Sequence, residues 1–403
     1  MTTEALAPLR SRRLQLPVFL VSLGHGATHW IAATFYLILP FIKRDLGLSY
    51  AEAGFLVTCF YLGSTAANLP SGSAVDLTGK RVLFQAVALV AGSLGLLALG
   101  LVTPYYGLAL LAVVIGASNM LWHPAAIAYL SGHFPRNRGY ALSMHALGAN
   151  LGDAVAPIFA GWLLLSRSWE STAMVNSVTG ILCAGLILAL LGRSDEGAVA
   201  AAKQLDIGAY FRSLGQVLKR RAIWSLCLMA GFRSMMQSGL LVFLPLYLAN
   251  ELKVNPFWMG FTLMLLQLGG VVATPIAGTL SDRIGRRPVV LAGMFGTTAL
   301  IVALSLISNA IVFVFCIAVL GFCMYAMRPV IHSWLMDGSP PHLAATMTSA
   351  MFGTQAGLSA LAPLIGGLLA DRYGLVSVFY FLAATVLVAN ALAFAVPRTE
   401  RLT

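Results

Sequence analysis

Long apolar segments run through the whole chain, and short polar stretches separate them. The hydrocarbon core of a bilayer is about 30 Å thick, so a helix rising about 1.5 Å per residue needs about 20 apolar residues to cross it. Twelve segments reach that length, at residues 14–41, 51–75, 82–102, 108–130, 139–165, 171–192, 222–248, 257–280, 288–307, 310–335, 344–370 and 374–396. The pattern predicts an all-α membrane protein with twelve transmembrane helices.

The longest polar interruption lies between the sixth and seventh segments, at residues 193–221. It predicts three parts: an N-terminal six-helix bundle over residues 1–192, a cytoplasmic linker over 193–221, and a C-terminal six-helix bundle over 222–403. Within the linker, Leu205 to Arg221 has the polarity pattern of an amphipathic helix at the membrane surface.

Composition and charge support a membrane location. Of the 403 residues 59% are hydrophobic and only 10% are charged, which leaves too little polar surface to cover a soluble globule. If the N-terminus is inside, the cytoplasmic termini and loops hold 18 of the 25 Lys and Arg residues. The positive-inside rule then places both termini in the cytoplasm and explains the net charge of +11 without a nucleic-acid partner. We expect a multi-pass protein of the bacterial cytoplasmic (inner) membrane.

The two halves of the chain repeat each other at an offset of 206 residues. The motif Gly72-x-x-x-Asp76-x-x-Gly79-Lys80-Arg81 recurs as Gly278-x-x-x-Asp282-Arg283-x-Gly285-Arg286-Arg287. The same offset, to within one residue, pairs Pro124 with Pro329 and Pro157 with Pro363. One register through both halves predicts two pseudo-symmetric bundles, and transporters with that symmetry bind substrate near the midplane between the halves.

The twelve segments, the central interruption and the doubled motif resemble the major facilitator superfamily over essentially the whole chain. His123-Pro124, Arg138-Gly139 and the segment from Ser143 to Pro157 resemble its fosmidomycin-resistance branch of drug exporters, although Ala149 and His29 depart from that pattern. The resemblance implies rocker-switch alternating access and a chain that works as a monomer. Fold resemblance does not by itself establish the substrate.

The repeated motifs are predicted to act as conformational latches in two loops. Their acidic members are Asp76 and Asp282, and the other residues assigned to the latches are Gly72, Lys80, Arg81, Gly278, Arg286 and Arg287. The basic side chains can pair with carboxylates or helix C-termini, and these contacts would break when access changes. The alternative is that the arginines only keep the loops inside the cell.

The fifth segment has small residues and a proline in the arrangement that the superfamily's exporters carry there. Gly148 and Gly152 permit close helix contact, and Pro157 removes a backbone hydrogen bond and permits a bend. We expect a hinge or a tight seam, with generic small-residue packing as the alternative.

Ionisable residues inside apolar segments are the candidates for binding substrate, because a charge there is costly. Arg233 lies near the middle of the seventh segment, and its guanidinium suits carboxylate, phosphonate or phosphate. His25 and His29 lie one turn apart near the middle of the first segment. The alternative for Arg233 is an ion pair within the protein.

His123 and Arg328 each directly precede the proline of their repeat and are also predicted to line the site. A buried neutral histidine with one satisfied nitrogen is common, so His123 has a structural alternative. For His145 and His332 the structural role is favoured.

Asp153 is the one carboxylate placed well inside an apolar segment, at a depth close to that of His29. A desolvated carboxylate and a histidine can both exchange protons near neutral pH, so proton coupling through Asp153 and His29 is predicted. A structural hydrogen bond between the two is the alternative.

The sequence contains no P-loop, metal-ligand helix pair or nucleophile elbow, so neither an enzyme nor a cofactor is expected. The prediction is a proton-coupled exporter of a small anionic or zwitterionic compound. One alternative is an importer or exchanger of small organic anions. Others are a metal-ion exporter that uses His25, His29 and His123, and a membrane receptor.

Overall fold

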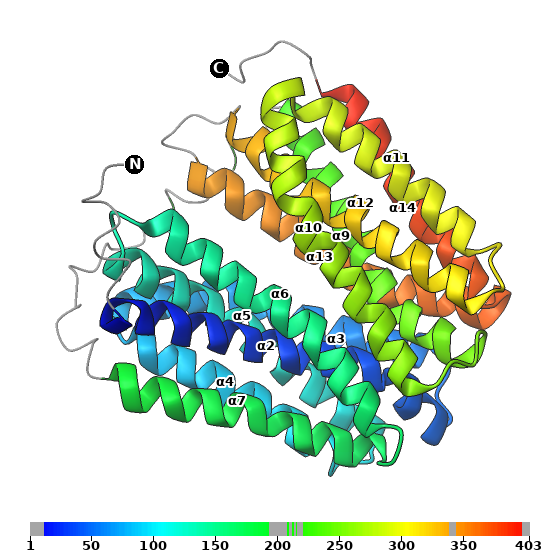
Figure 1. The fold of residues 1–403 in the computed structure, drawn as a ribbon, viewed down its shortest axis with the longest axis horizontal. Helices are drawn as coiled ribbons and strands as arrows, with labels where there is room; N and C mark the ends of the chain where they lie inside the picture. Colours follow the sequence, from blue (N-terminus) through cyan, green and yellow to red (C-terminus); the bar gives the residue numbers. More distant parts are fainter. Residues whose placement is uncertain are drawn as a thin grey trace. The chain divides into compact units, whose positions relative to one another are not determined.

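Twelve long helices account for the regular structure of the described chain (Figure 1). The computed structural model describes residues 12–192, 221–337 and 344–396 and the single residues 208, 212 and 215; the side chains of a few helix residues, Asp76 among them, fall outside the description. The helices are α2 (Arg12–Asp45), α3 (Tyr50–Thr78), α4 (Arg81–Leu99), α5 (Tyr105–His133), α6 (Arg138–Leu163), α7 (Trp169–Leu191), α9 (Arg221–Asn250), α10 (Pro256–Ile284), α11 (Arg286–Leu304), α12 (Ala310–Asp337), α13 (Ala344–Tyr373) and α14 (Val376–Ala395). The prediction of an all-α fold with twelve helices is confirmed.

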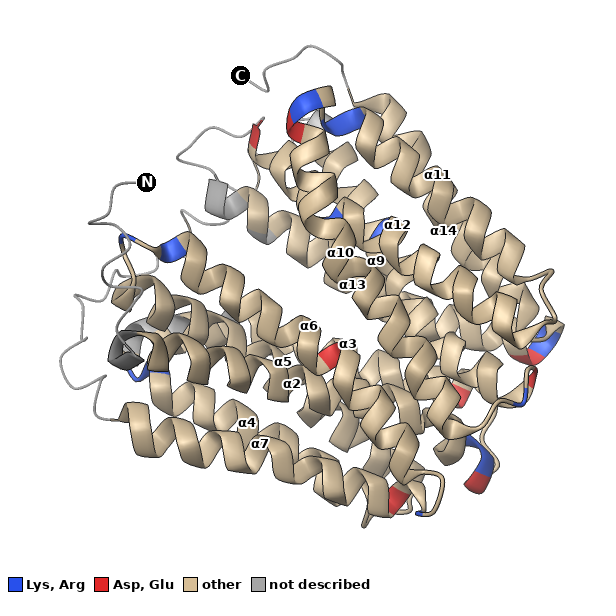
Figure 2. Ribbon diagram, in the orientation of Figure 1, with Lys and Arg blue, Asp and Glu red and all other residues tan. Residues whose placement is uncertain are grey.

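Helix length and composition fit a membrane. Within the described ranges, nine of the twelve helices are long and apolar enough to span a bilayer. The other three are α2, α3 and α6, and two of these carry His25, His29 and Asp153. Figure 2 shows most charged residues near the helix ends and few along the helices. The charged residues that do lie within helices therefore stand out as functional candidates.

The helices continue beyond the apolar segments that marked them in the sequence. As a result Asp76 lies in the last turn of α3 and Asp282 in the last turn of α10, so the prediction that both acids lie in loops is wrong. A helix satisfies its own backbone hydrogen bonds on either side of the hydrocarbon boundary, so an apolar run marks the membrane and not the helix end. The connection from α10 to α11 shrinks to Gly285, whose φ of +95° suits glycine.

Helix pairings repeat between the two sequence halves. In the first half α4 packs against α5 and α7, and in the second half α11 packs against α12 and α14. The offset that relates the sequence motifs therefore also relates the helix neighbours, as expected for a duplicated six-helix bundle.

By its contacts the chain divides into two compact units. The first holds the residues up to Ile38 and those from Leu62 through α7; the second holds Leu39–Tyr61 and α9 to α14. The limits predicted for the three parts of the chain stay a prediction. The predicted surface helix from Leu205 to Arg221 lies almost entirely outside the described residues.

The first unit has a buried core against which its polar site is built. Apolar side chains of α2, α4, α5 and α7 form most of it and α6 adds Ala141, with Trp122 and Tyr129 fully buried. This packing holds the turns of α2 and α5 that carry histidines in fixed positions.

Candidate functional site

Four histidines and one aspartate from α2, α5 and α6 gather inside the first unit. His25 and His29 follow each other by one turn of α2, so their side chains share a face. Their rings are 4.8 Å apart, and the ring of His123 on α5 lies 5.1 Å from that of His25. We call His25, His29 and His123 the histidine cluster.

His25 is held by α6. Its Nδ1 donates to the backbone carbonyl of His145 at 2.7 Å, and the two imidazole rings stack with centroids 3.7 Å apart. Only 5% of His25 is exposed. Because a carbonyl only accepts, the proton of neutral His25 must sit on Nδ1, which leaves Nε2 as the nitrogen with a lone pair.

His123 has the same arrangement. Its Nδ1 donates to the carbonyl of Asn119, one turn earlier on α5, at 2.9 Å. Neutral His123 therefore also carries its proton on Nδ1. The Nε2 atoms of His123 and His25 face each other at 3.3 Å.

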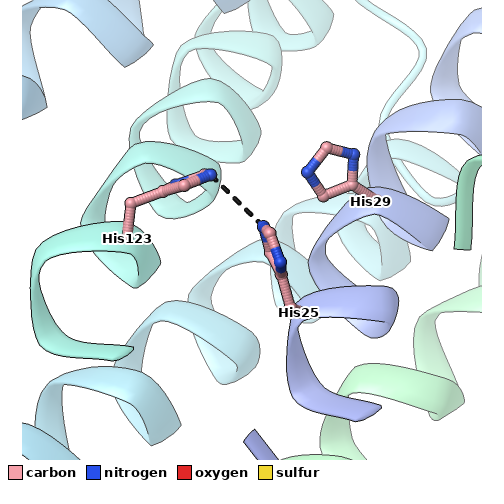
Figure 3. A group of neighbouring side chains, drawn as sticks. All are labelled: His25, His29 and His123. Carbon is pink, nitrogen blue, oxygen red and sulfur yellow. Dashed lines mark hydrogen bonds between the residues drawn. The ribbon is translucent and has the colours of Figure 1, made fainter. Parts of the chain in front are cut away.

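His29 is oriented by a carboxylate. Its Nδ1 lies 2.9 Å from Oδ2 of Asp153 on α6, and both side chains are about a quarter exposed, at 24% and 23%. Figure 3 shows a ring nitrogen of His29 turned toward the space between His25 and His123. One nitrogen from each member of the histidine cluster can be chosen so that all three lie within 4.8 Å of one another.

Two residues that the sequence did not select support this arrangement. The indole Nε1 of Trp122 donates to Nε2 of His145 at 3.1 Å, which fixes the ring that stacks on His25. His145 was favoured as structural, and the structure gives it the role of positioning His25. The signal available in the sequence was the run Trp122-His123-Pro124, but nothing in it indicated which helix the indole contacts.

Arg233 lies in the second unit, on α9. It is 3% exposed, and its Nη2 donates to the backbone carbonyl of Met324 on α12 at 2.9 Å. Its Nε has no hydrogen-bond partner in the described part of the chain, and no carboxylate described there pairs with it. Arg328, one turn after Met324 on α12, is exposed.

The glycines of α6 form a close seam with α2. A Cβ on Gly148 would collide with the carbonyl oxygen of Ser22, and one on Gly152 with that of Gly26. Pro157 lies inside α6 one turn beyond this seam. The corresponding Gly357 of α13 has nothing described within 4 Å of an added Cβ.

The second repeated motif forms an ionic cluster at a helix junction. Arg286 begins α11 and pairs with Asp282 in the last turn of α10, and its Nε donates to Asp337, the last residue of α12, at 2.9 Å. Each charge sits at the helix end that disfavours it, so the three depend on one another. Arg287, the second residue of α11, donates to the backbone carbonyl of Phe394 near the end of α14 at 2.9 Å.

The structure describes Gly72, Lys80 and Arg81 of the first copy of the motif. The side chain of Asp76 lies outside the description. Lys80 precedes the first residue of α4, and the guanidinium of Arg81 lies close to Gly132 near the end of α5. Gly72 and Gly278 have open space around an added Cβ among the described atoms, so close packing does not account for them.

Comparison with known proteins identifies the family. The model of the Major Facilitator Superfamily matches residues 19–354 and, a second time, residues 226–403. The chain belongs to the Major Facilitator Superfamily. As a member of that superfamily it is a multi-pass membrane transport protein.

Several known transport proteins are similar to this chain over most of its length. The hexuronate transporter of Escherichia coli (strain K12) is 20% identical, over 91% of this chain and 90% of its own. The phosphoglycerate transporter protein of Salmonella typhimurium is 25% identical, over 66% of this chain and 63% of its own. The crystal structure of a bacterial homolog of the human lysosomal transporter Spinster, inward-facing and occupied, has a TM-score of 0.83 at 16% identity and covers 97% of this chain and 98% of its own. This structural likeness concerns the fold alone.

Proposed function

We propose that this superfamily member carries small organic anions across the membrane and that Arg233 binds their anionic group. The observation that carries the proposal is a buried guanidinium without a carboxylate partner among the described residues. A buried charge is retained only where something compensates its desolvation. An anionic substrate supplies that compensation.

The hydrogen bonds of Arg233 indicate how the anion binds. Nη2 is used by the carbonyl of Met324, while Nε has no described partner. A guanidinium offers five N–H donors in a planar fork that matches a carboxylate or phosphate. The donors not committed to α12 are thus available to a substrate oxygen.

The names of two relatives support an anionic substrate. Phosphoglycerate carries phosphate and carboxylate groups, and a hexuronate carries a carboxylate. Both are small, polar and negatively charged, which is the chemistry that a buried arginine selects.

The test measures uptake of labelled substrates by the full chain in proteoliposomes, and an internal pH dye records any accompanying proton movement. The substrates are a phosphoglycerate, a hexuronate, fosmidomycin and, as a contrast, a lipophilic cation. We expect flux with at least one anion, about tenfold or more loss in Arg233→Gln, and partial retention in Arg233→Lys. Arg372→Gln, which removes an exposed arginine at the end of α13 in the same unit, should keep wild-type flux. Flux of the cation alone, unchanged in Arg233→Gln, would overturn the proposal.

We propose export as the direction of net transport and the cytoplasmic membrane as the location. The support for export is the resemblance of Gly148, Gly152 and Pro157 to the exporters' motif in this helix. Imposed gradients of both signs test it, because an importer would respond to the opposite gradient. The fosmidomycin-resistance branch stays a prediction, and flux of fosmidomycin tests it directly.

Proton coupling through Asp153 and His29 also stays a prediction. The two side chains are in contact, which fits the predicted coupling and its structural alternative equally. Exchange that keeps its full dependence on pH in Asp153→Asn and His29→Gln would remove the coupling prediction.

A further inference from the structure

In each imidazole of the histidine cluster, Nδ1 contacts a backbone carbonyl or a carboxylate, and the other ring nitrogen points into the cluster. The Nδ1 atoms of His25 and His123 donate to backbone carbonyls, and Nδ1 of His29 faces the Asp153 carboxylate. Histidines that ligate metals almost always place the second nitrogen against a carbonyl or carboxylate in this way. All three members have that support.

The spacing of the two inner nitrogens matches a metal site. A tetrahedral ion with metal–nitrogen bonds of about 2.0–2.1 Å holds two ligand nitrogens about 3.3–3.4 Å apart. Nε2 of His25 and Nε2 of His123 are 3.3 Å apart. His29 completes a set in which the ligand atoms lie within 4.8 Å of one another, so a small rotation of its partly exposed ring brings it into place.

The proton positions on His25 and His123 also indicate a cation between their Nε2 atoms. With both Nδ1 atoms donating to carbonyls, neutral His25 and His123 present two lone pairs to each other. Two acceptors at 3.3 Å repel unless a cation lies between them. That cation is either a single proton or a metal ion, and the third inward-facing imidazole favours the metal, because a shared proton needs only two.

We propose that His25, His29 and His123 form a binding site for a divalent first-row transition metal such as Zn²⁺. Imidazole nitrogens suit zinc, copper and nickel, whereas magnesium and calcium prefer oxygen ligands. Asp153 orients His29 and contributes negative charge, and the stacked His145 orients His25. The exposed quarter of His29 marks the side from which an ion enters. The proposal is independent of anion transport by Arg233.

The experiment titrates the purified full chain, stripped with a chelator, with zinc chloride at pH 7.5 in a calorimeter. We expect one ion per chain, a thermal stabilisation that depends on zinc concentration, and an X-ray absorption spectrum dominated by imidazole nitrogens at about 2.0–2.1 Å. Affinity should fall about 100-fold or more in His25→Gln and His123→Gln. It should fall about 10- to 100-fold in Asp153→Asn, which removes the charge behind His29 but no ligand.

His332→Gln is the matched control, because His332 is partly buried within a helix of the second unit and stacks on Phe352 outside the cluster. It should bind zinc as the wild type does. Each variant is compared only if its zinc-free melting temperature stays close to that of the wild type; where His25→Gln fails this criterion, His123→Gln carries the test. Unchanged zinc binding in His123→Gln, or no stoichiometric zinc in the wild type, would overturn the proposal. The second result would leave a shared proton between His25 and His123.

Discussion

The imidazole of His29 and the carboxylate of Asp153 lie 2.9 Å apart across 124 positions of sequence, joining α2 to α6. The same two helices also meet closely at Gly148 and Gly152 of α6. His25 and His123, the other members of the histidine cluster, lie next to His29. The α2–α6 interface is therefore both a close helix seam within the first unit and the frame of its polar site.

Gly148→Ala should destabilise the protein. Its Cβ would meet the carbonyl of Ser22, and overpacking of this kind typically costs about 1–3 kcal/mol, which exceeds the gain of up to about 1 kcal/mol in helix propensity. The melting temperature in detergent measures the change. Gly357→Ala in α13 is the control and should leave stability unchanged or raise it, because an added Cβ there has open space among the described atoms. Equal melting temperatures for the two variants would contradict a tight seam.

Arg233→Met should stabilise the substrate-free protein while it abolishes anion transport. Methionine fills a similar volume without a charge, and replacing buried charged groups by apolar ones often stabilises by about 1–4 kcal/mol. Thermal melting and flux are measured on the same preparation. A lower melting temperature would mean that the guanidinium is compensated within the protein, as its ion-pair alternative requires.

Trp122→Phe should lower the zinc affinity of the histidine cluster, although Trp122 is not one of its members. It leaves Nε2 of His145 as a buried acceptor that has lost its donor, at a cost of about 1–3 kcal/mol. His145 then holds the ring of His25 less firmly, so zinc affinity should fall about tenfold. Trp162→Phe, at an exposed position of α6, is the control and should change neither quantity. Wild-type zinc affinity in Trp122→Phe would show that the indole does not position the site.

Arg286→Gln should alter the rate of transport more than stability. The variant removes the pairing with Asp282 and Asp337, and exposed ion pairs contribute little to folding. The latch prediction requires this ionic cluster to set the balance between access states, so we expect a several-fold change in flux with a nearly unchanged melting temperature. Arg283→Gln, exposed in the same turn, should behave as the wild type. Unchanged flux in Arg286→Gln would favour a role in membrane topology alone.

The sequence by itself determined the number and class of the helices. Spanning length is a property of a continuous apolar run, so twelve runs indicate twelve helices wherever they pack. The repeated motif likewise indicated duplication, because a constant offset needs no knowledge of contacts. The positions of the helix ends did not follow, since Asp76 and Asp282 lie past the apolar runs but still within hydrogen-bonded turns.

Only the tertiary structure decided which ionisable residues meet. From the sequence, His25 and His29 share one helix face, and His123 joined them only in the metal-exporter alternative, because the rotation of each helix about its axis was unknown. That rotation brings His123 to His25 and the carbonyl of His145 to the same ring, and it leaves Arg233 without a carboxylate among the described residues. Helix rotation depends on packing between segments far apart in the chain, such as the glycine seam of α2 and α6, and no single apolar run encodes it.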